Sequence, residues 1–182
     1  PWSGAGSVAY RFNNDRLRQR MDLPDQSHEF RYDTSQRLKD ILSPAGTFTY
    51  NYFGGSSLVD VLALPGGASV DNDFDAVGRL KETRLRQNGG ATLNLHSYVY
   101  NPRHERFLET RLTSYVDYTY DDIGQLETAR GFETGGGIVR RHENATYTYD
   151  AADNLATRQR DQLTQTFSTT GNALNRLASV SH

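Results

Sequence analysis

The sequence predicts an all-β protein built from antiparallel β-hairpin repeats, and three observations lead to this fold class. A short motif of paired aromatic residues followed by Asp or Asn recurs along the chain. Aromatic residues supply much of the apolar surface, with 11 Tyr and 8 Phe against 36% apolar residues in all. No long stretch has the apolar period of 3.6 residues that indicates a helix. A repeat of this kind predicts stacked supersecondary units.

Four copies of the motif are well preserved. In each copy an aromatic residue precedes Asp, and a Leu follows six residues after that aromatic residue. The copies span residues 30–38, 73–80, 118–126 and 147–155.

Degenerate copies fill the intervals between these four. The aromatic residues expected next to the turn are Phe12, Tyr32, Tyr50, Phe74, Tyr100, Tyr120, Tyr149 and Phe167. Their spacing varies from 18 to 29 residues. We therefore expect a single array of about eight units over residues 1–182. Because the chain opens with Pro1 and not with Met, we also expect it to be a piece of a longer protein.

The motif has a physical reading as a hairpin. Tyr118 and Tyr120 are two residues apart and so point to the same face of a strand, while the polar residue between them faces the other way. Asp121 then starts a turn, because its carboxylate accepts hydrogen bonds from nearby backbone N–H groups. Gly124 stands where a type I turn ends in a left-handed residue and a bulge, a geometry that favours Gly, Asn or Asp. The same position is occupied elsewhere by Gly78, Asp153, Gln36 and His104.

Composition and charge exclude several classes of protein. The net charge is −2 and the two signs are interspersed, so no basic stripe for nucleic acid is present. The absence of Cys excludes a disulfide framework, a thiolate zinc site and a Cys nucleophile. No apolar run approaches the roughly 18 residues that a membrane-spanning helix needs.

The repeat resembles the YD repeat of the rearrangement-hotspot (Rhs) proteins, which include polymorphic toxins, insecticidal toxin-complex subunits and teneurins. The resemblance covers about residues 7–180. It implies a curved or spiral sheet that forms part of an exported or cell-surface shell. In the bacterial toxins of this family such a shell encloses an effector. The implied partners are therefore the remainder of the shell or an enclosed effector.

The chain also departs from the family. The Asp-Pro-x-Gly core signature that supports self-cleavage is absent, so no catalytic residue is transferred from the family to this chain. Eight units are too few for a full shell, and we expect a partial turn with open edges that favour edge-to-edge association.

Two sets of residues are candidates for binding. Aromatic side chains away from the repeat stripe could stack on sugars of a glycan or against a cell-surface protein; the alternative is that they belong to the core. The alternating carboxylates of β-strand residues 71–75 could bind a hard cation such as calcium, or they form a solvated acidic edge. The aromatic candidates are Trp2, Tyr52, Phe53 and Tyr115, and the carboxylates are Asp71, Asp73 and Asp75.

No arrangement of residues indicates catalysis. The five His residues lack a partner motif, and Gly135-Gly136-Gly137 has no helix signal behind it. We expect a structural shell segment that encloses or displays an effector, or acts as a surface scaffold. The alternative is an extracellular module that binds carbohydrate or protein, and a fragment of a self-processing enzyme is the third interpretation.

Overall fold

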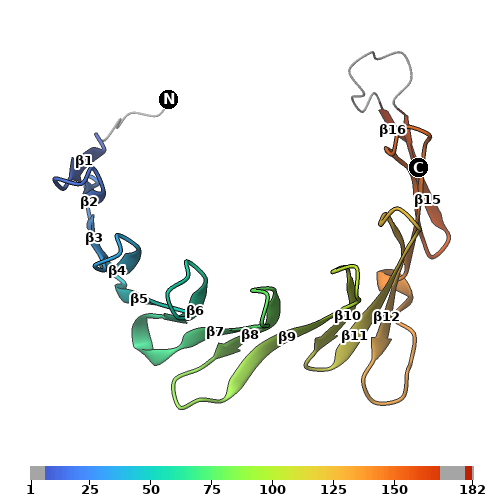
Figure 1. Ribbon diagram of the computed structural model, residues 1–182, viewed down its shortest axis with the longest axis horizontal. Coiled ribbons are helices and arrows are strands. Elements are labelled where there is room, and N and C mark those ends of the chain that lie inside the picture. The colour runs from blue at the N-terminus through green and yellow to red at the C-terminus, as the bar shows by residue number, and fades with distance from the viewer. Residues whose placement is uncertain (1–6, 169–178, 182) are drawn as a thin grey trace. The chain divides into compact units, whose positions relative to one another are not determined.

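A computed structural model describes residues 7–168 and 179–181, which form antiparallel β-structure (Figure 1). Sixteen strands of the described residues follow one another across the sheet in sequence order. The chain divides into two compact units, Pro1–Leu95 and His96–His182, which we call the N-terminal and C-terminal units. The predicted all-β fold of antiparallel hairpins is therefore confirmed.

The strands are short and joined by tight connections. Those of the N-terminal unit are β1 (Ala9–Phe12), β2 (Arg18–Asp22), β3 (Ser27–Tyr32), β4 (Leu38–Ser43), β5 (Gly46–Tyr52), β6 (Val59–Ala63), β7 (Ser69–Phe74) and β8 (Leu80–Arg86). β9 (Thr92–Tyr100) begins in this unit and ends in the next. The C-terminal unit continues with β10 (Arg106–Arg111), β11 (Ser114–Tyr120), β12 (Leu126–Glu133), β13 (Ala145–Tyr149), β14 (Leu155–Arg160), β15 (Leu163–Ser168) and β16 (Ser179–Ser181).

Helical structure in the described residues is limited to two short 3-10 turns, η1 (Pro65–Gly67) and η2 (Arg141–Glu143). None of the described helices is long and apolar enough to cross a membrane.

One turn design closes the repeat hairpins. Asp33 accepts hydrogen bonds through Oδ1 from the backbone N–H groups of Ser35 and Arg37, both at 2.9 Å. These bonds occupy N–H groups that the strand ladder leaves free. The bond from the Arg37 N–H is the main cause that lowers the pKa of Asp33. The same pair of bonds forms at Asn13, Asp75, Asn101, Asp121 and Asp150.

The left-handed residue of the turn lies where the sequence places it. Gly78 and Gly124 have φ of 81° and 89°, and a register shift follows each turn, as a bulge requires. Gln36 and His104 adopt φ of 62° and 66° at the same position. The Asx hydrogen bonds therefore hold the turn even where the side chain disfavours this geometry.

The third unit was aligned wrongly from the sequence. The structure places Tyr52, not Tyr50, beside the turn: Tyr52 pairs with Val59, and a register shift separates it from Asn51. Phe53 occupies the Asp position and donates its backbone N–H to Leu58. The hydroxyl of Ser56 accepts the N–H of Leu58 at 3.1 Å and so partly replaces the missing carboxylate.

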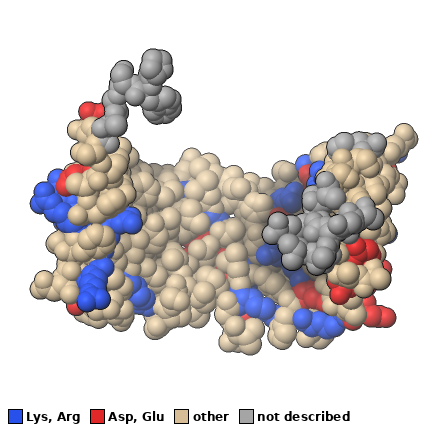
Figure 2. Space-filling view, turned by 90° about the horizontal axis from the view of Figure 1, so that it is seen from above, with Lys and Arg blue, Asp and Glu red and all other residues tan. Residues whose placement is uncertain are grey.

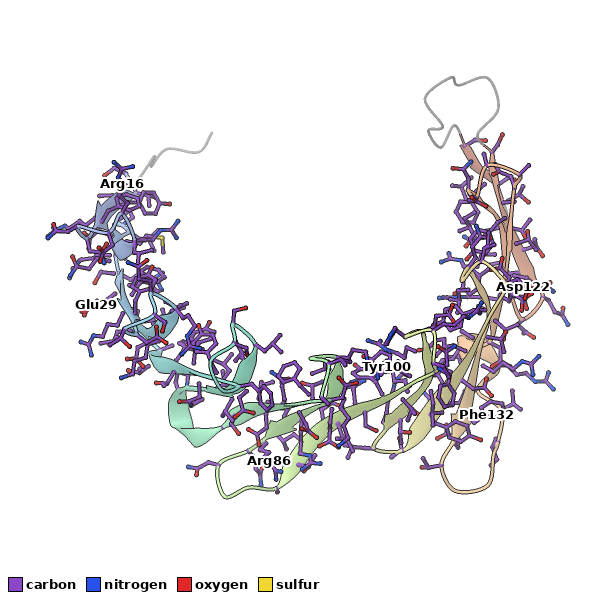
Figure 3. The ribbon with its side chains drawn as sticks, viewed as in Figure 1. Arg16, Glu29, Arg86, Tyr100, Asp122 and Phe132 are labelled. Carbon is purple, nitrogen blue, oxygen red and sulfur yellow. The ribbon has the colours of Figure 1, made fainter. Side chains whose placement is uncertain are left out.

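The two faces of the sheet differ in chemistry. We call the side that carries the paired repeat aromatics the tyrosine face and the other side the opposite face. In the N-terminal unit the tyrosine face contains cross-strand rows such as Tyr50, Leu62, Val70 and Leu85. The opposite face carries ion pairs, and Figure 3 shows Glu29 and Arg86 projecting from the ribbon there. These pairs are Arg20–Asp22, Arg31–Glu29, Arg84–Glu82 and Arg86–Asp71.

The core is thin, and its most buried part lies in the C-terminal unit. Among the described residues the buried apolar side chains are Val116, Ala129 and Ala145, and the buried polar ones are Glu109 and Ser114. All five belong to β10, β11, β12 and β13. A single sheet layer leaves most other apolar side chains half-exposed.

Candidate functional site

Four repeat tyrosines that stand beside a turn bind the preceding hairpin. The hydroxyl of Tyr120 donates a hydrogen bond of 2.6 Å to the carbonyl of Arg106, the first residue of the preceding return strand. That carbonyl lies at a bulge, where the ladder is interrupted. We call this hydrogen bond a staple. The other staples are Tyr32 to Arg18 at 2.9 Å, Tyr52 to Leu38 at 2.6 Å and Tyr149 to Leu126 at 3.0 Å.

The fourth hairpin has a substitute for the staple. Phe74 occupies the tyrosine position and has no hydroxyl. The side-chain amide of Asn72 donates a hydrogen bond of 2.9 Å to the carbonyl of Val59 instead. The acceptor position is thus satisfied by a different donor from the same strand.

Arginine side chains add contacts between neighbouring hairpins. The guanidinium of Arg37 lies 4.4 Å from the ring centroid of Tyr52, and that of Arg18 lies 5.6 Å from the centroid of Phe30. Arg103 donates to the carbonyls of Asp121 and Asp122, both at 2.9 Å. Such contacts connect successive units through cation–π and charge-assisted interactions.

An insertion folds onto the tyrosine face of the C-terminal unit. Residues 134–144, which we call the strap, connect β12 to β13. The N–H of Arg140 donates to the carbonyl of Gly131 at 2.8 Å, and Asn144 accepts the N–H of Gly131 through Oδ1 at 2.9 Å. A Cβ atom at Gly131 would lie 2.8 Å from both Cβ and Oε2 of Glu143. The strap therefore packs this closely only because residue 131 has no side chain.

Charged groups beneath and within the strap form one connected network. Glu109, 7% exposed, binds the Arg111 guanidinium at 2.9 Å, His96 at 2.8 Å and the Tyr118 hydroxyl at 2.8 Å. Arg111 also reaches Glu143 of the strap at 3.2 Å.

These contacts change the titration of Glu109. Burial alone would raise the pKa of this carboxyl group, but the hydrogen bonds from Arg111, His96 and Tyr118 outweigh burial and lower the pKa to about 2. The same environment raises the pKa of Tyr118, first through burial and then through its bond to Glu109. Glu109 therefore remains ionised at neutral pH although it is buried.

A hollow of about 450 Å³ lies beside the strap. One cross-strand row crosses it, in the order Tyr118, Ala129, Ala145 and Arg160. The two alanines are small where the N-terminal unit has Leu62 and Val70 in its row. The walls are formed by Tyr118, Tyr147, His142, Glu143, Arg111 and Arg160.

The aromatic candidates from the sequence do not form one site. Tyr52 lies on the stripe and not away from it, because its hydroxyl forms a staple. Phe53 is 46% exposed in a turn, with its ring centroid 5.9 Å from that of Phe74. Tyr115 stacks on Phe132 on the opposite face, with 5.0 Å between the two ring centroids. Figure 3 shows Phe132 and Tyr100 projecting from opposite sides of the ribbon. Trp2 lies outside the described residues.

Each of the three candidate carboxylates contacts a basic side chain. Asp71 binds Arg86 at 2.6 Å, Asp73 binds Lys81 at 3.1 Å, and Asp75 binds Arg79 at 2.6 Å. Asp71 and Asp73 lie on β7, whereas Asp75 begins the next turn. Among the described residues, no group of three His, Asp or Glu side chains is placed to hold a metal ion.

Sequence reasoning missed the Glu109 network and the strap. The signal available was the step from Tyr120 to Tyr149, the longest in the array, which marked an insertion. Nothing in the local pattern around Glu109 distinguishes it from a solvated strand residue.

Comparison with known proteins supports the fold. No family model and no curated protein matches the chain. The crystal structure of TcdB2-TccC3-Cdc42 superposes on 94% of the chain with a TM-score of 0.76 at 15% sequence identity. A crystal structure of TcdB2-TccC3 without its hypervariable C-terminal region gives a TM-score of 0.75 over 95% of the chain, also at 15% identity. The Tc holotoxin pore of Photorhabdus luminescens gives 0.72 over 94%, at 16% identity.

The chain spans about a tenth of the length of each of these proteins, since the matches cover 10% of those chains. The similarity extends over both units, and the neighbouring chains have Rhs/YD-repeat shells. The resemblance to the Rhs/YD-repeat proteins is thus confirmed at the level of the fold.

Proposed function

We propose that the chain is a wall segment of an Rhs/YD-repeat shell that encloses a polypeptide effector. The observation that carries the proposal is the staple between hairpins, together with a fold shared with Tc toxin chains at a TM-score of 0.76. Backbone pairing and staples make the wall, and the proposal assigns no catalytic role to it. By the same resemblance, the parent protein is exported or displayed at the cell surface.

The staples suit such a wall because they lie between units. A single hairpin is marginally stable, so a one-layer array depends on contacts with its neighbours. The hydroxyl bonds and the arginine stacks supply those contacts without a second layer of structure. The tyrosine face therefore remains available to an enclosed chain.

A chimera tests the proposal. In TcdB2-TccC3, the segment that superposes on this chain is replaced by residues 7–168, and a reporter domain is fused at the C-terminal end. We expect a closed particle in which the reporter resists protease until detergent or denaturant opens the shell. A chimera that folds, by electron microscopy, but leaves the reporter digestible at the rate of a free control contradicts enclosure. The unmodified TcdB2-TccC3 fusion with the same reporter is the matched control.

The alternative of a glycan-binding module gains no support from the staple of Tyr52. Phe53 and Tyr115 remain predictions for such binding, and edge-to-edge association through β1 or β16 remains a prediction as well. A glycan array with Phe53→Ala and Tyr115→Ala tests the first, and sedimentation at several concentrations tests the second.

A further inference from the structure

The hollow beside the strap is lined by two arginines, and they differ in their partners. Arg111 lies between two carboxylates, Glu109 and Glu143. Arg160 is exposed, and its guanidinium forms no ion pair with any residue in the described ranges 7–168 and 179–181. The cationic end of the hollow is therefore the end at Arg160. Figure 2, seen from above, shows Lys and Arg side chains on this unit.

The floor of the hollow is apolar and lies close to that cation. Ala129 and Ala145 are paired across β12 and β13, and Arg160 is paired with Ala145 across β13 and β14. Since adjacent strands are about 4.8 Å apart, the backbone of Arg160 lies one strand spacing from Ala145 and two from Ala129. The rings of Tyr118 and Tyr147 border this floor.

We propose that the hollow binds an extended peptide segment, placing an aromatic or large aliphatic side chain on Ala129 and Ala145 and a neighbouring carboxylate against Arg160. The inference rests on the proposed function, which supplies an enclosed polypeptide as the occupant. The spacing between side chains two apart in an extended segment, about 7 Å, lies between the one and two strand spacings that separate the backbone of Arg160 from those of Ala145 and Ala129. Charge complementarity selects an acidic residue over a basic one, and the glycine at 131 lets the strap form the side wall.

The strap makes the site a local feature of this unit. Glu143 and His142 enter the wall only because residues 134–144 fold back over Gly131. The network through Glu109 and Arg111 keeps the strap in that place. Binding therefore depends on strap docking as well as on Arg160.

The test uses the chain itself and three acetylated, amidated tripeptides: Phe-Ala-Glu, Phe-Ala-Gln and Phe-Ala-Lys. Methyl NMR of the alanines follows the titration. We expect Ala129 and Ala145 to shift with the Glu peptide, with binding about fivefold weaker for the Gln peptide and weaker still for the Lys peptide.

Variants locate the binding. Arg160→Gln is expected to weaken the Glu peptide about fivefold and leave the Gln peptide unchanged, whereas Arg130→Gln, on the opposite face, changes neither. Ala145→Leu fills the floor and abolishes binding of all three peptides; if that variant does not fold, Arg160→Gln still decides. Equal affinity for the three peptides, or shifts confined to other alanines, overturns the inference. Such a result leaves the reporter-protection experiment on the chimera untouched, so the two failures are distinguishable.

Discussion

In the N-terminal unit, bulky aliphatic residues such as Leu62 and Val70 fill the tyrosine face, and the charges stand in exposed pairs on the opposite face. In the C-terminal unit, Ala129 and Gly131 leave space on the tyrosine face, and a strap and a buried Glu109 occupy part of it. The same hairpin thus builds a plain wall in one unit and a wall with a hollow in the other. The difference teaches that small residues plus one insertion suffice to add a site without changing the strand order.

The largest expected effect comes from Glu109, the one buried carboxylate among residues 7–168 and 179–181. Glu109→Ala removes the acceptor that the partly exposed Arg111 and His96 share with the Tyr118 hydroxyl. We expect a loss of about 3 kcal/mol in the free energy of unfolding, measured with urea. The matched control is Glu127→Ala, because Glu127 is exposed on β12 of the same unit. An equal loss of unfolding free energy in both variants would show that the Glu109 network contributes no more than an exposed carboxylate.

The same network gives a pH dependence of definite sign. The pKa of Glu109 is lowered to about 2 from an ordinary value of 4.5, so its contribution is present above pH 4.5 and disappears as pH falls toward 2. The stability difference between wild type and Glu109→Gln is therefore constant from pH 7 to about 5 and shrinks below that. Urea midpoints across this range measure it; a difference that grows on acidification contradicts the assignment.

The next effect concerns the docking of the strap. Gly131→Ala places a methyl group against Glu143 and is expected to cost about 1 to 3 kcal/mol and to expose Arg141 to trypsin. Gly135→Ala, in the same strap, meets no atom within 4 Å and serves as the control. Cleavage rates read by mass spectrometry distinguish them. Unchanged cleavage in Gly131→Ala would mean that the strap is not held by this contact.

A smaller effect is expected to be equal in the two units. Tyr52→Phe and Tyr120→Phe each delete one staple and leave a carbonyl unpaired, at a cost of about 1 kcal/mol. The control is Tyr147→Phe, whose hydroxyl binds nothing among the described residues. Thermal or urea unfolding gives the values. If only one of the two substitutions lowered the free energy of unfolding, the two units would not share the same hairpin design.

The smallest effect belongs to the exposed ion pairs of the N-terminal unit. Glu29→Gln removes a pair whose side chains are 42% and 55% exposed, so solvent already screens it. We expect a change below about 0.5 kcal/mol, comparable to the scatter of surface substitutions. A loss as large as that of Glu109→Ala would contradict the contrast drawn between the faces.

Much of the fold follows from local chemistry. The carboxylates of Asp33 and Asp121 define their turns by short-range hydrogen bonds, so their hairpins are readable from sequence. The hairpin of the third unit is not readable in this way, because Tyr50-Asn51 resembles the motif while Phe53 occupies the true Asp position. The Glu109 network depends on Arg111, two residues away, but also on Glu143, which only the folded strap brings near. No periodic pattern records such a contact.

The staples have one consequence for how arrays of this kind change. Donor and acceptor are separated by 14 residues for Tyr32, Tyr52 and Tyr120 but by 23 for Tyr149, and the bond forms in each case. The extra residues leave the sheet at the margin remote from the Asx turns. The alignment of successive hairpins therefore does not depend on the length of the connector between them. Natural or engineered peptide insertions can be accepted at this margin of the sheet without a change in strand order.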